Sequence, residues 1–145
     1  MPATQAQSGF GSKFQIESTV GGGVFTTVTD VTSITAPDTR LDLEDATHME
    51  SPGGYEEMIP LLKRSDAVTV NGHKVFGDST RALLKTAQDN REKRAFRIIS
   101  PDSTRRIVFS GYVERIGGGE MPHDGKMTHS VTVKPTGQIT EEANT

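Results

Sequence analysis

The sequence predicts a mainly β domain, arranged as a β-sandwich or barrel with one flanking α-helix. Fifteen glycines and seven prolines divide the 145 residues into short segments, which is typical of strands joined by turns. Several segments alternate apolar with polar residues, and only one has the apolar spacing of an amphipathic helix. A layer of strands with one helix packed against it is the simplest architecture for such a chain.

Alternation of apolar and polar side chains predicts the strands of this domain. In chain order they cover residues 13–18, 25–35, 67–75, 94–100, 104–116 and 128–134. The pattern is clearest over 104–116, where Ile107, Phe109 and Val113 share one face. We therefore expect these three side chains to point into the core.

One helix is expected between the third and fourth long strands. Asp78 is a typical N-cap for the segment from Thr80 to Ala87. Leu83 and Leu84 lie on its narrow apolar stripe, so we expect them to pack against the core. Apolar residues also surround Pro60 between Tyr55 and Leu62, and this segment is predicted to be a helical turn or an irregular plug into the core.

The chain has enough residues for one core, with less regular segments around it. Residues 1–11 are small and polar without a period, which predicts a flexible N-terminal arm before a β domain at 12–136. Residues 137–145 are predicted to be a polar, acidic C-terminal tail. Residues 36–54 have no sustained period, and loops of this length are usually functional or disordered.

Charge is distributed unevenly along a chain whose net charge is only −3. Residues 38–57 contain seven acids and one base, whereas residues 74–106 contain nine bases and four acids. If the two regions lie apart on the surface, identical copies attract head to tail, as in rings and filaments. The candidate inter-subunit contacts are Asp38, Arg40, Leu41, Asp42, Leu43, Glu44, Asp45, Arg91, Lys93 and Arg94.

Composition excludes several other functions. The chain has no cysteine, which rules out disulfides, thiolate metal sites and thiol nucleophiles. The four histidines lack metal-ligand spacing, and no nucleophile is accompanied by a base, so we expect no enzyme activity, metal or cofactor. The apolar runs are too short for a membrane-spanning helix. A nucleic-acid-binding β-barrel remains an alternative, although Phe96 is the only aromatic residue among the clustered bases after Arg81.

Three segments in order resemble the major tail tube protein of long-tailed, non-contractile bacteriophages. The first comprises LDLEDAT at 41–47 and EEMIPLLKRSDAVTV at 56–70. The second is FSGYV at 109–113, and the third covers residues 127–137. Leu62 and Ala67 depart from this pattern, because the family often has glycine at both positions.

The resemblance implies a tail-tube fold whose sheets join those of neighbours into a continuous barrel. Rings of six subunits would stack into a hollow tube, with residues 36–54, the arm and the tail making inter-subunit contacts. The tube would conduct DNA without binding it specifically, and would meet tail tip or baseplate, tape-measure and tail terminator proteins. The expected location is the virion tail, assembled in the host cytoplasm and away from membranes. A β-barrel adaptor or a secreted-tube protein of a tail-like or type VI secretion machine is the alternative.

Overall fold

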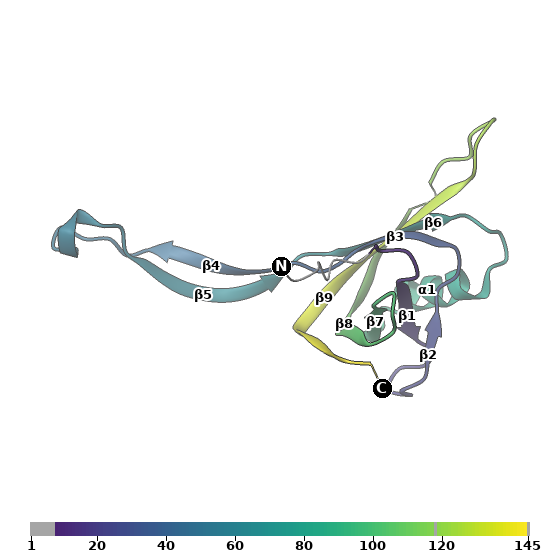
Figure 1. Ribbon diagram of the computed structural model, residues 1–145, viewed down its shortest axis with the longest axis horizontal. Coiled ribbons are helices and arrows are strands. Elements are labelled where there is room, and N and C mark those ends of the chain that lie inside the picture. The colour runs from purple at the N-terminus through teal and green to yellow at the C-terminus, as the bar shows by residue number, and fades with distance from the viewer. Residues whose placement is uncertain (1–7, 118, 145) are drawn as a thin grey trace, which may run out of the picture.

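The computed structural model describes residues 8–117 and 119–144, and the elements in this part confirm the mainly β prediction. Two parts are visible in Figure 1: a body that contains α1, and a long hairpin of β4 and β5 that projects from it. The elements are β1 (Lys13–Glu17), β2 (Phe25–Thr27), β3 (Val31–Thr35), β4 (Thr39–Asp45), the 3-10 turn η1 (Pro52–Gly54), β5 (Met58–Ser65), β6 (Val68–His73), α1 (Ser79–Asp89), β7 (Arg94–Ile99), β8 (Arg105–Gly117) and β9 (Thr128–Ala143).

The body is built on one antiparallel sheet of seven strands, in the order β2-β1-β7-β8-β9-β6-β3. The sheet curls, because β3 at one edge comes back to contact β1 near the other edge. The amide of Val28, between β2 and β3, donates to the carbonyl of Phe14 at 2.8 Å. The curl encloses one apolar core within the subunit.

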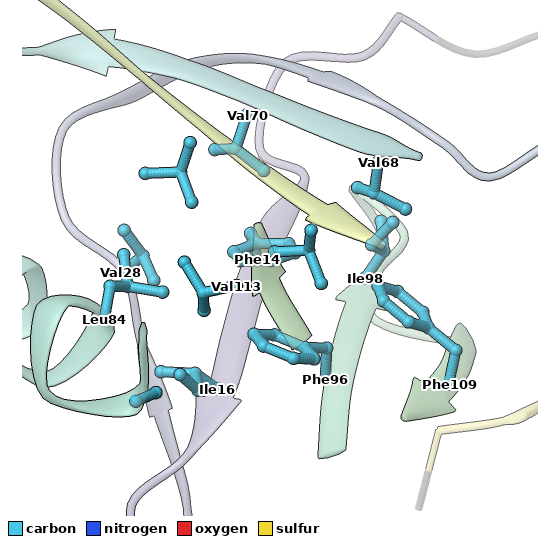
Figure 2. Packing of buried hydrophobic residues seen from close by; sticks show 13 residues of the cluster. Phe14, Ile16, Val28, Val68, Val70, Leu84, Phe96, Ile98, Phe109 and Val113 are labelled. Atoms are coloured by element: carbon cyan, nitrogen blue, oxygen red, sulfur yellow. The ribbon is translucent and has the colours of Figure 1, made fainter. Parts of the chain in front are cut away.

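The core consists of the inward faces of these strands and one side of α1. Phe14, Phe96 and Phe109 stack in a row across β1, β7 and β8, with ring centroids 5.6 and 5.5 Å apart (Figure 2). The structure places the residues expected in the core as follows: Phe109, Val113 and Leu84 are buried, and Ile107 and Leu83 are half-buried against the cluster.

Helix α1 begins at the predicted cap. The carboxylate of Asp78 accepts a hydrogen bond from the amide of Thr80 at 3.0 Å. Burial raises the pKa of Asp78, but hydrogen bonds from Thr29 and Thr80 outweigh burial and hold the pKa below its usual range. The cap therefore also ties α1 to the connection between β2 and β3.

Four local predictions are wrong. Residues 25–35 form two strands, β2 and β3, at opposite edges of the sheet rather than one strand. Residues 58–65 form the exposed strand β5 rather than a plug into the core, because this segment pairs with β4 outside the body. Thr39–Asp45 is a strand rather than a loop, for the same reason. The last strand continues through the expected tail to Ala143, since residues 140–143 pair with the start of β8. Most of the predicted arm, residues 1–7, lies outside the described residues.

Candidate assembly interface

The hairpin, residues 39–65, is a two-stranded ribbon with its own register. Pairing runs from Thr39 and Ser65 to Asp45 and Met58, with a bulge opposite Asp42. An isolated two-stranded hairpin is marginally stable in water at best. Figure 1 shows the hairpin leaving the body, so its outer part receives no support from the body of the same subunit. The outer part of the hairpin therefore needs a surface from another chain to pack against.

Apolar side chains are exposed on both faces of the hairpin. Leu41, Leu43 and Met58 share one face with Pro60, because paired residues on antiparallel strands point the same way. The pairing of Asp45 with Met58 and of Leu41 with Lys63 places one acid and one base at the ends of this apolar stretch. Leu41 is 46% exposed to solvent and Leu43 is 52% exposed. Ile59 pairs with Glu44 and lies on the other face, and Ile59, Leu61 and Leu62 are also exposed. An apolar strip of this kind is typical of a protein contact surface.

The tip of the hairpin, residues 46–57, is held by its own polar contacts. Ser51 is buried, its hydroxyl donates to the carboxylate of Glu57 at 2.9 Å, and it accepts from the amide of His48 at 3.0 Å. Nε2 of His48 lies 3.3 Å from the same carboxylate. At the end of β4, hydrogen bonds from the Thr47 hydroxyl and amide hold the pKa of Asp45 below its usual range. These contacts within residues 46–57 fix the shape of the tip.

Acidic and basic residues are unevenly distributed along the hairpin. From residue 44 to residue 57 the chain contains five acids and neither lysine nor arginine. Near the body the charges are mixed, since Arg40 lies 3.9 Å from Asp66 and Arg64 forms an ion pair with Asp42. One end of the hairpin is therefore strongly acidic.

A groove of about 1090 Å³ lies where the hairpin joins the body, and we call it the base groove. Its walls are residues 39–41 of β4, residues 63–65 of β5 and residues 134–139 of β9. Nζ of Lys134 crosses from β9 to the carbonyl of Ser65 at 2.7 Å. Because β6 pairs with β9 only as far as Val133, β9 presents an edge without a strand partner here, as far as the described residues show.

The basic region from 74 to 106 does not form one patch. Ion pairs or ring contacts within the subunit occupy several of its members, namely Lys85 with Asp89, Arg105 with Glu141, Arg106 with Glu142 and Arg97 over the ring of Phe25. Arg91 and Lys93 are exposed in the turn between α1 and β7. Acids from outside the region, Glu141 and Glu142, thus compensate two of its bases, Arg105 and Arg106.

Arg94 must be corrected as a candidate inter-subunit contact. Its side chain is buried, and the residue is only 5% exposed. The guanidinium donates to the carbonyls of Glu17 and Ser18 at 2.9 and 3.0 Å, and to the carboxylate of Glu92. A neighbouring subunit cannot reach a group whose donors are used inside its own subunit.

The other candidate contacts lie where a neighbour can reach them. Asp38 is exposed just before the hairpin, and Asp42 is half-buried beside Arg64. The candidates that are exposed on the hairpin itself are Arg40, Leu41, Leu43, Glu44 and Asp45. The apolar residues of β5, Met58 to Leu62, complete this surface although the sequence pattern assigned them to the core. The alternation of Leu41 and Leu43 with acids was the one signal for this hairpin.

Among residues 8–117 and 119–144, no three His, Cys, Asp or Glu side chains gather as metal ligands. The same part of the chain contains no helix long and apolar enough to cross a bilayer. Contact with other chains is the property that the geometry supports.

Known structures match this architecture, although no protein-family model and no curated protein matches the chain. A chain from the tail of an empty gene transfer agent particle, refined with C6 symmetry, superposes with a TM-score of 0.74 at 19% identity, covering 93% of this chain and 98% of that one. The SPP1 tail tube gives 0.72 at 13%, covering 94% and 78%. The sheath/tube terminator of the extracellular contractile injection system PVC gives 0.72 at 11%, covering 98% and 100%. The chain has the tail-tube fold.

Proposed function

We propose that this protein is the structural subunit of a phage-type tail tube, assembling into stacked six-membered rings that conduct a genome during ejection. The observation that carries the proposal is a tail-tube body with an ordered hairpin that its own subunit leaves uncovered. The six-fold ring is proposed from the gene transfer agent tail, which was refined with C6 symmetry.

Physical reasoning supports assembly through strand edges and the hairpin. β2 and β3 are the two edges of the body sheet, and exposed edges tend to pair with other strands. The apolar strip of the hairpin favours burial against a neighbour by roughly 25 cal/mol per Å² of apolar surface removed from water. Ring closure and stacking would cover both features at once.

The remaining roles follow from this proposal. DNA would pass through the tube without specific binding, and no chemistry, cofactor or metal would be required. The other partners would be the tail tip or baseplate, the tape-measure protein and the tail terminator. The protein would be found in the virion tail after assembly in the host cytoplasm.

A second candidate is an adaptor or terminator of a tail-like machine. The specific observation in its favour is the likeness to the PVC sheath/tube terminator, which spans nearly all of both chains. A terminator closes a tube and would stop at one ring, whereas a tube subunit would stack further.

Electron microscopy of the concentrated, purified protein distinguishes the two candidates. We expect long tubes from the full chain. A matched control replaces residues 40–64 with an Asn-Gly turn, which removes no residue of the buried core. This control should fold and form no tubes. Isolated closed rings from the full chain would favour the adaptor, and particles with neither rings nor tubes would contradict both.

A further inference from the structure

We propose that the base groove of one subunit binds the acidic hairpin tip of a second copy of this chain. The inference rests on the proposed function, because it requires copies to meet, and it names the surface that receives the hairpin. The groove and the tip lie at opposite ends of the same hairpin. Repetition of one such contact would propagate along an assembly.

The base groove is suited to carboxylates. Arg40, Lys63, Arg64 and Lys134 all line it, although they come from three different strands. Arg40 and Arg64 each have one acidic partner within the subunit. Lys63 and Lys134 are paired with no acid in the described part of the chain, so their charge is available to a neighbour.

The tip supplies matching acids. Glu50 and Glu56 are exposed in the tip, and Glu44 is exposed just before it in β4; none of the three forms an ion pair among the described residues. The Ser51, His48 and Glu57 contacts already order the tip, which lowers the entropy cost of binding. Carboxylates on an ordered loop can therefore meet the basic side chains of the groove without a folding step.

The tip cannot fill the groove of its own subunit. Residues 42–45 of β4 separate the last groove residue, Leu41, from the start of the tip, and the five steps from residue 41 to residue 46 span roughly 16 Å at about 3.3 Å per residue. Figure 1 shows the tip at the far end of the hairpin from the body. The occupant must come from another copy.

The turn that carries Arg91 and Lys93 is the competing receptor. It presents two exposed bases, whereas the groove combines four bases with a concave shape. The groove also presents the free edge of β9 beyond Val133, whose main-chain groups can hydrogen-bond an incoming segment. These features favour the groove.

Charge exchange tests the contact directly. Tip reversal (Glu50→Lys with Glu56→Lys) and groove reversal (Lys63→Glu with Lys134→Glu) should each raise the concentration needed for tubes by about tenfold, since two exposed pairs are each worth up to about 1 kcal/mol. Both reversals in one chain should restore assembly. The matched control combines tip reversal with Arg91→Glu and Lys93→Glu. Rescue by this control, or rescue by neither combination, would overturn the proposal.

Cysteine cross-linking tests the same contact without reversed charges. The natural chain has no cysteine, so every disulfide comes from the introduced pair. Tubes of Glu56→Cys with Lys63→Cys should yield a ladder of covalent multimers on oxidation, and tubes of Glu56→Cys with Arg91→Cys should not. The reverse result, or no ladder from either pair, would overturn the proposed contact while the tubes themselves still support the proposed function. Failure of the unaltered protein to form tubes would instead count against both.

Discussion

Nη1 of Arg94 donates a hydrogen bond to the main-chain carbonyl of Glu17 at 2.9 Å and so ties β7 to the end of β1. The carboxylate of Glu17 in turn accepts from the amides of Gly21 and Gly23 at 3.0 and 3.3 Å, which holds the turn into the edge strand β2. Arg94 and Glu17 together fix one edge of the sheet. A base that the charge pattern suggested as an external contact is thus internal.

Replacing Arg94 should destabilise the subunit itself. Arg94→Ala leaves two carbonyls and the Glu92 carboxylate without their donor, so the free energy of unfolding should fall by about 1–3 kcal/mol. Denaturant unfolding of the monomer measures this change. The matched control Arg91→Ala, at an exposed position three residues earlier, should change the free energy by less than about 0.5 kcal/mol. Equal effects of the two variants would contradict the assignment.

Phe109 stands at the end of the aromatic row in the core. Phe109→Ala should lower the free energy of unfolding by about 3–5 kcal/mol, because it removes a buried ring next to Phe96 and leaves a cavity. Tyr112→Ala, on the same strand but 45% exposed, is the control and should cost less. Thermal unfolding curves of the two variants measure both losses of stability. An unchanged melting temperature for Phe109→Ala would mean that the core lies elsewhere.

The absence of a side chain at Gly72 lets the carbonyl of Asp30 and the guanidinium of Arg81 approach the backbone closely. A Cβ at this position would lie 2.4 Å from the carbonyl oxygen of Asp30 and 2.6 Å from Nη2 of Arg81. Gly72→Ala should therefore force β3 or α1 to shift and cost about 1–3 kcal/mol, as overpacking does. Gly9→Ala meets no atom within 4 Å and serves as the control. Chemical denaturation showing equal stability for the two variants would argue against this close approach.

The free energy of unfolding should decrease at acidic pH because of His129. Burial lowers the pKa of this histidine, and Arg81 and Lys74 lower it further, while the negative charge of Asp78 acts in the opposite direction. The unfolded chain then binds more protons than the folded one below about pH 6.5, the ordinary pKa of histidine. The corresponding stability is present in full above that pH and is lost as the pH falls through the lower pKa of the folded state.

Unfolding curves at several pH values should therefore be less pH-dependent for His129→Gln than for the parent protein. His123→Gln, in the exposed connection between β8 and β9, is the control and should keep the pH dependence of the parent. If both variants followed the parent curve, another group would be responsible for the acid sensitivity.

The hairpin tip should be open to proteases in the monomer and protected in tubes. Residues 46–57 are mostly exposed and project from the body, and exposed loop tips are preferred sites of cleavage. Limited proteolysis with glutamate-specific protease should cut after Glu50 or Glu56 in the monomer, and assembly should suppress this cleavage. Mass spectrometry identifies the sites. Similar rates of cleavage in both states would show that the tip stays outside the interface.

Local patterns predicted the elements that depend on neighbours along the chain. The alternation over 104–116 predicted β8 and its inward residue Phe109, because side chains on a strand point to opposite faces in turn. Asp78 predicted the start of α1, since an N-cap needs only a short side chain and the amides of the first turn. These features depend on interactions over a few residues.

The sequence by itself thus determined a mainly β chain, its single helix, its inward strand faces and its acidic segment. Only the tertiary structure decided that Met58 to Leu62 lie outside the core and that Arg94 is buried within the subunit. It also decided that one groove is lined by residues 39–41, 63–65 and 134–139. Apolar side chains favour any surface that excludes water, so their sequence does not specify whether that surface lies in the same subunit. The interaction energy of two charges likewise depends on their separation in space. That separation is set by the curled sheet, which brings strands together that are remote in the sequence.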